Sequence, residues 1–292
     1  MSDNSKGTTK QHFVPSFYLK NFAHDGFLCV YDRYDKRFFD STPDKMCKQR
    51  LLYETKWESA DPKLGKYVLY NQIEKLFSAN ETKWSVIISK IIKRFETNCH
   101  KMPSGLVCSK AEKEGIAEFI ACTFLRHPTQ MKSTMAYYAD LITGDSQLDQ
   151  IRVIGDLFNM WGWGSPKSFL EHSVKTMSFD PKIEGSPINV LKANIQQMNM
   201  FFICNNDGSF MTSSFPVLGM EDSYQQVFLP LSPRIIICCS DSPDTRDKRN
   251  RFNQATEESV DILNAMYLAQ SIDTCRYLIA HDKTTISRAI KT

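Results

Sequence analysis

The spacing of apolar positions changes along the chain. It predicts strands toward both ends and helices in the middle. Apolar runs at 27–31 and 36–39 flank a charged turn and predict a β-hairpin. From about residue 67 the apolar positions recur every three or four residues, as on one face of a helix. The clearest such stripe comprises Trp84, Ile87, Ile88, Ile91 and Phe95. Ser109 and Glu112 have the spacing of a capping box, and Pro128 is expected to end the helix that begins there.

Continuous apolar runs return after residue 198. The runs 200–204 and 210–212 flank an Asp-Gly turn and predict a second hairpin. The run 235–239 is so apolar that we expect a central strand, and a last helix and strand follow at 257–271 and 276–280. Because a lone hairpin is marginally stable in water, the N-terminal hairpin and the C-terminal strands are expected to share one mostly antiparallel sheet. The sequence thus predicts an α+β fold, with the helical middle packed on that sheet.

Length and composition fit a single globular domain. The chain has 292 residues, of which 42% are hydrophobic and 24% charged, so it can bury a core. Residues 1–11 are expected to form a polar, mobile tail, and the glycines and prolines between 143 and 187 to mark an interruption or subdomain edge. No apolar run is long enough to span a bilayer, and the N-terminus lacks a secretory signal. We therefore expect a cytoplasmic protein with no membrane contact.

The cysteines predict reduced thiols. There are nine, an odd number, and most lie in apolar stretches rather than in a regular framework. The nearest approach to a metal cluster is Cys99-His100 with Cys108, whose spacing matches no common zinc site. We expect no metal site, and the sequence identifies no cofactor.

Two clusters of basic residues occur although the formal net charge is only +3. Lys90, Lys93 and Arg94 fall on one helical segment, and a polar loop carries Arg246, Lys248, Arg249 and Arg251. Such clusters are usually solvated surface. They are also the residues that would follow a nucleic-acid backbone, and on this interpretation the helical cluster binds substrate.

Gln11 and His12 stand directly before an apolar segment that Pro15 can start as a helix. An imidazole held there by Gln11 or by a carboxylate would serve as a general acid or base, with Gln11 itself contacting substrate. The alternative is a partly buried histidine that ties the N-terminal arm to the body through one hydrogen bond. Both interpretations stay open.

Glu74 lies beside an apolar stripe, and a buried carboxylate needs a partner. Arg126, at the end of the next helix, suits that role. The pair is either a structural ion pair or a catalytic acid with a phosphate clamp. Thr212 and Ser213 follow a strand, so their hydroxyls either bind phosphate or cap a turn. We expect all these groups to meet His12 in one polar pocket.

Several segments together resemble one protein family. They are 11–15 with Phe17-Tyr18-Leu19 and Phe22, Tyr53, Ile73-Glu74, 119–126 with Pro128, 210–213 with Pro216-Val217, 230–233, 260–264 and Arg276-Tyr277. The chain is similar over nearly its full length to the mainly bacterial family called domain of unknown function 4238. The resemblance implies candidate positions but no reaction.

One position departs from the pattern that the resemblance implies. Members of the family usually have an aspartate after Thr-Ser, whereas this chain has Ser214-Phe215. If that aspartate is a metal ligand or general base, its role is vacated here or taken by another carboxylate, such as Glu74 or Asp222.

Two functions from different classes follow. The sequence contains no Walker A loop, dinucleotide fingerprint, zinc-protease helix or nucleophile elbow. The first hypothesis is a hydrolase of nucleic acid, RNA favoured, acting as a bacterial defence or toxin effector, with His12 as base, Glu74 as acid partner and Arg126 as phosphate clamp. The second is a non-catalytic module that binds a nucleotide, a nucleic acid or a partner protein of a defence system.

Overall fold

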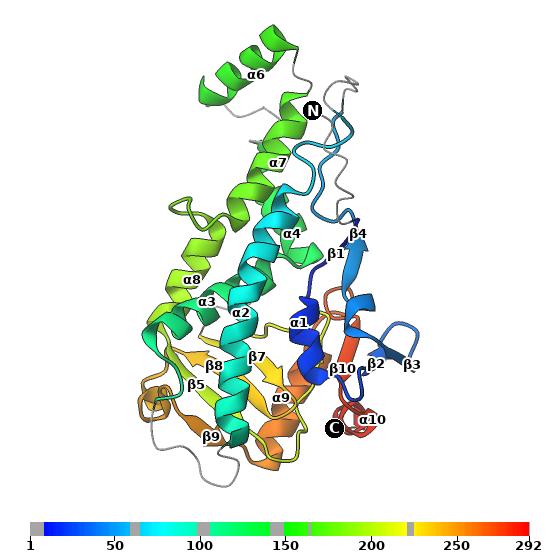
Figure 1. The fold of residues 1–292 in the computed structure, drawn as a ribbon, viewed down its shortest axis with the longest axis vertical. Coiled ribbons are helices and arrows are strands. Elements are labelled where there is room, and N and C mark those ends of the chain that lie inside the picture. Colours follow the sequence, from blue (N-terminus) through cyan, green and yellow to red (C-terminus); the bar gives the residue numbers. More distant parts are fainter. Residues whose placement is uncertain are drawn as a thin grey trace.

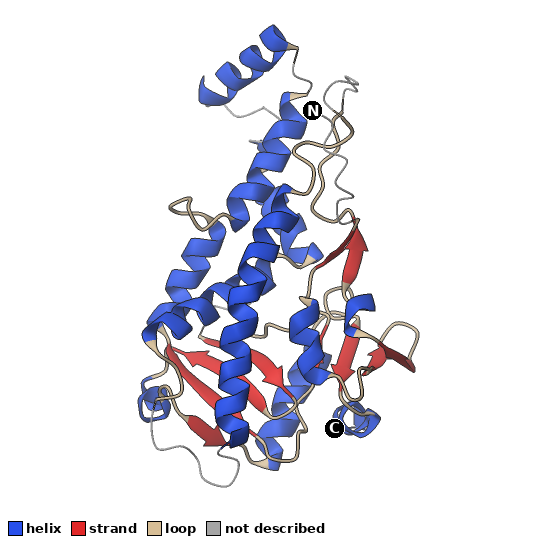
Figure 2. Cartoon of the chain, viewed as in Figure 1, coloured by secondary structure: helices blue, strands red, loops and turns tan. Residues whose placement is uncertain are grey.

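The computed structural model describes residues 9–58, 65–97, 106–140, 149–162, 165–220 and 225–291. Long helices run along the longest axis of the molecule, and most strands gather toward one end (Figures 1 and 2). The chain is an α+β protein with a helical middle and strands at both ends, as the sequence predicts. Cys99, His100 and Asp222 lie outside the described residues.

The helices predicted from apolar periodicity are present, and further helices form between 149 and 197, where an interruption was expected, and at 283–291. In chain order the helices are α1 (Ser16–Leu19), α2 (Gln72–Thr97), α3 (Lys110–Leu125), α4 (Pro128–Tyr137), α6 (Asp149–Trp161), α7 (Pro166–Phe179), α8 (Pro187–Gln197), α9 (Glu257–Ala269) and α10 (Lys283–Lys291). On α2 the expected stripe is buried at Trp84, Ile88, Ile91 and Phe95. Trp84 packs on Phe119 of α3, with ring centroids 5.5 Å apart, so the stripe faces α3.

The ends of α3 match the prediction. Ser109 accepts the N–H of Glu112, and the Glu112 carboxylate accepts the N–H of Ser109, which completes the capping box. The helix ends at Leu125 with Arg126 as its C-cap, and Pro128 begins α4. All residues of α3 from Gly115 to Leu125 are buried, and they pack mainly against α8 and α2.

Within the described residues the strands form three sheets. The smallest pairs β1 (Lys10–His12) with β4 (Lys48–Arg50). A four-stranded sheet has the order β3 (Arg37–Ser41), β2 (Leu28–Asp32), β10 (Tyr277–Ala280), β6 (Thr212–Ser213). Another has the order β7 (Gln226–Ser232), β8 (Ile235–Ser240), β5 (Asn199–Cys204), β9 (Phe252–Gln254). All pairs are antiparallel except β5 with β9.

The N-terminal hairpin joins C-terminal strands as expected, because β2 pairs with β10 and β10 with β6. The remaining C-terminal strands make a separate sheet. The prediction that 200–204 and 210–212 form a hairpin is wrong. Asn264 of α9 donates to the Ser209 carbonyl at 2.8 Å and accepts the Met211 N–H at 3.1 Å, and so takes the backbone groups that a hairpin partner would use.

The expected mobile tail does not extend to residue 11. Lys10–His12 is a strand, and the side chain of Gln11 is fully buried. Because β4 supplies the pairing strand from the region 43–66, this order could not be predicted from the N-terminal residues alone.

One large apolar core connects most of the helices with both four-stranded sheets. Eight cysteines belong to the described residues, and all eight are free; seven of them are buried. No helix in the described part of the chain is long and apolar enough to cross a membrane.

Candidate functional site around Arg126

Arg126 is the centre of a buried polar cluster. Its side chain is only 1% exposed, and every nitrogen of the guanidinium has a partner. Nε donates to the Tyr53 hydroxyl at 3.3 Å, Nη1 to Glu81 Oε1 at 2.8 Å, and Nη2 to the main-chain oxygen of His12. The guanidinium also lies over the Phe77 ring, 4.4 Å from its centroid. The positive charge of Arg126 is therefore paired inside the fold and is not available to a ligand.

Gln11 and Tyr53 attach β1 to this cluster. The Tyr53 hydroxyl donates to the His12 carbonyl at 2.9 Å, and the Tyr53 N–H donates to Gln11 Oε1 at 2.9 Å. Gln11 Nε2 in turn donates to Glu54 Oε1 at 2.7 Å, and Glu54 Oε2 accepts the N–H of Asn71 at 3.2 Å. Both ends of the Gln11 amide are thus hydrogen-bonded within the fold, and the side chain is fully buried, which argues against contact with a substrate.

The imidazole of His12 points to a different partner. Its Nε2 lies 3.2 Å from the Asp44 carbonyl oxygen. Partial burial lowers the pKa of His12, and the nearby charges of Lys48 and Arg126 lower it further, while the hydrogen bond to Asp44 opposes the shift. The ring is therefore neutral near pH 7 and able to accept a proton.

Glu74 is not the partner of Arg126, which corrects the sequence prediction. Glu81 forms the ion pair, and Oε2 of Glu74 is buried without a hydrogen-bond partner in the described structure. Burial raises the pKa of Glu74 to about 7, an effect that the Arg126 charge reduces and the carboxylates of Glu81 and Glu54 increase. Glu74 and Glu81 are seven residues apart and share a face of α2, so periodicity alone could not distinguish them.

Thr212 and Ser213 do not present their hydroxyls to this cluster. Both residues are fully buried on β6. The Thr212 hydroxyl is hydrogen-bonded to the Tyr18 hydroxyl at 2.7 Å. Ser213 Oγ accepts the Phe215 N–H at 3.0 Å and donates to the Phe215 carbonyl at 2.7 Å. The turn-capping alternative thus describes Ser213.

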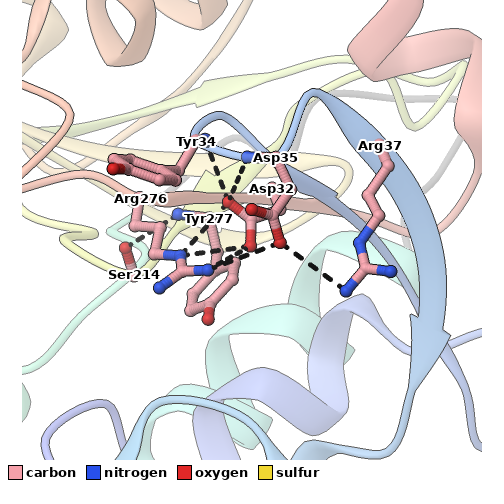
Figure 3. A network of polar contacts seen from close by, with 7 residues as sticks. All are labelled: Asp32, Tyr34, Asp35, Arg37, Ser214, Arg276 and Tyr277. Atoms are coloured by element: carbon pink, nitrogen blue, oxygen red, sulfur yellow. Dashed lines mark hydrogen bonds and ion pairs between the residues drawn. The ribbon is translucent and has the colours of Figure 1, made fainter.

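Ser214 lies in a different polar network, shown in Figure 3. Its hydroxyl accepts the Tyr277 N–H at 3.1 Å. The neighbouring Arg276 binds Asp32 through Nε at 3.1 Å and Nη2 at 2.6 Å. Burial opposes ionisation of Asp32, but the hydrogen bonds from Arg276 and two backbone N–H groups lower its pKa overall. The carboxylates of this network are Asp32 and Asp35, whereas Glu74 lies near the Arg126 cluster.

The basic residues of α2 are remote from Glu74. Lys90 follows Glu74 by 16 residues, which corresponds to about 24 Å along a helix. Lys90 and Lys93 are exposed, whereas Arg94 binds Glu112 through two bonds of 3.0 and 2.8 Å and the Val107 carbonyl at 2.6 Å. These residues cannot act on the same reacting atoms as His12 and Glu74.

Two buried histidines are not among the candidates predicted from the sequence. His127 caps α4 by accepting the Thr129 N–H at 3.3 Å, and its ring packs edge-on against Phe13 and Phe215. Burial lowers its pKa to about 4. His172 has a pKa of about 4, mainly through burial, and its Nε2 lies 2.8 Å from Gln72 Oε1. No group of three or more histidine, cysteine or acidic side chains suited to a metal occurs within the described ranges.

The geometry defines an α+β protein whose N-terminal strand is locked to the helical middle by one buried arginine. A family model described as "Protein of unknown function (DUF4238)" matches residues 10–284, so the chain belongs to this family. Neither the comparison with curated proteins nor that with solved structures found a match.

Proposed function

We propose that this protein binds nucleic acid, with RNA favoured, through the basic residues of α2 and of the loop 243–251. One observation carries the proposal: the fold brings together the two basic clusters that the sequence separates. Arg94 donates to the Val107 carbonyl, and the Val107 N–H donates to the Asn250 carbonyl at 3.0 Å. Phe95 packs on Phe252 with ring centroids 5.3 Å apart. The end of α2 and this loop therefore form one basic corner.

Charges at the basic corner are available to a ligand. Lys90, Lys93, Arg246 and Arg251 are exposed, and among the described residues Lys90 and Lys93 form no ion pair. The loop 243–251 carries four basic residues against Asp244 and Asp247. Arg249 is held by Asn199 Oδ1 at 2.9 Å, which orders the loop. Exposed, unpaired cations on ordered backbone suit contacts to phosphate, which supply sequence-independent affinity.

The bonds of Arg126 fit a role in holding the fold together better than a role as a phosphate clamp. Arg126 is saturated by Glu81, Tyr53 and the His12 carbonyl, and its side chain is 1% exposed. A clamp would have to break these bonds in a buried site. On this proposal the cluster stabilises the fold, and the basic corner provides recognition.

The test compares charge reversal at the corner with charge reversal elsewhere. Fluorescence anisotropy of the full chain with a single-stranded RNA, and with DNA of the same sequence, measures Kd as a function of salt. The double variant Lys90→Glu/Lys93→Glu should weaken RNA binding at least about tenfold and reduce the salt slope by about 1.5. The control Lys132→Glu/Lys182→Glu changes two other exposed lysines. An equal loss in the control, or no RNA binding by the parent chain, would overturn the proposal.

A hydrolase remains the second candidate, because of Glu74. Its carboxyl lacks a hydrogen-bond partner and has a pKa of about 7, so it can donate a proton at neutral pH, while the neutral His12 can accept one. The assay follows RNA and DNA integrity with the wild type, His12→Ala and Glu74→Gln. Cleavage by the wild type that both variants lose would favour the hydrolase. Expression in bacteria challenged with phage would test the proposed defence role, with His12→Ala as the comparison.

A further inference from the structure

A polar cleft at the C-terminal end of α2 shares no lining residue with the Arg126 cluster or with the exposed lysines Lys90 and Lys93. Its volume is about 530 Å³, within the range of small-molecule sites. The C-terminal end of α2, at the bottom of Figure 1, contributes Ile92 and Glu96. The turns after β5 and β7 contribute Asp207, Pro233 and Arg234, and His281 follows β10. Segments distant in sequence thus converge on one hollow.

The two turns are fixed to each other by backbone hydrogen bonds. The Asn205 N–H donates to the Arg234 carbonyl at 2.9 Å, and the Asp207 N–H donates to Asn205 Oδ1 at 2.7 Å. Gly208, at φ +72°, lies between them, and a Cβ there would contact the Arg234 stem at 3.7 Å and the His281 ring at 3.8 Å. Asp207 and Arg234 consequently extend from a rigid base.

The charges of the cleft are not neutralised by one another. In the part of the chain that the structure describes, the side chains of Glu96, Asp207 and Arg234 form no ion pair and no hydrogen bond. His281 is held by Asp282, with Nε2 and Oδ2 2.7 Å apart. The cleft therefore offers one free cation and two free anions on different walls, beside the apolar surface of Ile92 and Pro233.

We propose that this cleft binds a small zwitterion, such as a free amino acid or a dipeptide. Arg234 would take the carboxylate, since its planar fork matches two oxygens. Asp207 and Glu96 would take the ammonium group, and Ile92 and Pro233 would contact an apolar side chain. A phosphate ester without an ammonium group would meet two unpaired carboxylates with no positive group to pair with them, which disfavours it. The cleft shares no residue with the basic corner, so this proposal does not depend on the proposed nucleic-acid binding.

Calorimetric titration of the full chain with the twenty standard amino acids and glycyl-leucine tests the cleft directly. At least one probe should bind saturably, and its two single-charge analogues, the C-terminal amide and the N-acetyl form, should each bind at least about tenfold more weakly. Absence of saturable binding by every probe up to about 10 mM, well above a weak Kd of 1 mM, would overturn the proposal. So would equal affinity for either analogue.

Variants assign the two ends of the ligand. Arg234→Gln should weaken the zwitterion about tenfold or more and remove the preference over the amide. Asp207→Asn with Glu96→Gln should remove the preference over the N-acetyl form. Arg50→Gln and Asp241→Asn change exposed charges outside the cleft and should leave binding unchanged. RNA binding by Arg234→Gln should equal that of the parent, so failure here and failure of the proposed function are distinguishable. Zwitterion binding that survives Arg234→Gln would place the ligand elsewhere.

Discussion

Arg126 donates a hydrogen bond to the main-chain oxygen of His12, while the imidazole of the same residue turns toward Asp44. The arginine thus holds the backbone of β1 without contacting the side chain that could perform chemistry. Tyr53 reinforces the attachment by donating to the same oxygen at 2.9 Å. A substitution of Arg126 would release the strand and displace His12, so loss of activity in such a variant would not identify Arg126 as a residue that touches substrate.

The ion pair of Arg126 with Glu81 predicts a contrast between two glutamates on one helix. Glu81→Ala strands a buried guanidinium and should lower the free energy of unfolding by about 3–5 kcal/mol. Glu74→Ala removes a carboxyl that has no hydrogen-bond partner and should cost far less. Urea unfolding of both variants measures the difference. A larger loss for Glu74→Ala would contradict the assignment of Glu81 as the partner.

Glu74 should make the folded protein less stable as the pH rises. Its folded pKa of about 7 exceeds the ordinary value of 4.5, so the native state holds the proton more tightly than the unfolded chain. The stabilising effect is complete below about pH 4.5 and is lost as the pH rises through about 7. Relative to wild type, Glu74→Gln should gain about 1–3 kcal/mol between pH 4.5 and 8, a range that allows for partial exposure. A constant difference over this pH range would refute the shift.

His127 should have the opposite effect on the pH dependence of stability, and make the folded protein less stable as the pH falls. Its folded pKa of about 4 lies below the ordinary 6.5, so the unfolded chain binds the proton more readily. The contribution of the neutral ring is present above pH 6.5 and is lost as the pH falls toward 4. Side-chain NMR should show an imidazole that stays neutral at pH 5.5. His127→Asn keeps a helix-capping acceptor and should flatten the dependence of stability on pH between 4 and 6.5. If this dependence is unchanged in the variant, the lowered pKa of His127 is contradicted.

Two glycines with similar backbone angles should respond differently to alanine. At Gly219, with φ +80°, a Cβ would lie 2.0 Å from the main-chain oxygen of Gln226, and backbone cannot easily move away. At Gly185, with φ +73°, a Cβ meets no atom within 4 Å. Gly185→Ala should cost about 1 kcal/mol from the left-handed conformation, and Gly219→Ala at least about 3 kcal/mol. Thermal unfolding of the pair checks this, and equal losses would mean that the chain near Gly219 adapts.

Local signals in the sequence predicted much of the fold. The capping box of Ser109 and the stripe through Trp84 depend on neighbours within one helix, and both are present in the structure. The pairing of residues 209–211 depends instead on Asn264, which lies more than fifty positions later. A turn signal such as Asp207-Gly208 carries no information about that competing amide, and so the second hairpin was predicted wrongly.

The polar cluster around Arg126 could be predicted only in part, because some of its partners come from distant parts of the chain. An arginine at the end of a buried helix indicated an ion pair, and the structure supplies one. Which carboxylate forms it depends on distances across two helices, since Glu74 and Glu81 share a face of α2. The burial of Gln11 was not predictable from its own polar segment, because the covering strand β4 and Glu54 come from elsewhere in the chain.

The pairing of β2 with β10 has a consequence for synthesis of the protein. Val30 is opposite Ile279, so the N-terminal hairpin leaves the ribosome long before the strand that completes its sheet. Until then β2 presents an unpaired edge, which invites association between nascent chains. Sheet closure must wait until residues 277–280 have been synthesised, and such non-local pairing folds slowly. Stalled or shortened translation products that lack β10 are therefore the species of this protein most exposed to aggregation and to capture by chaperones.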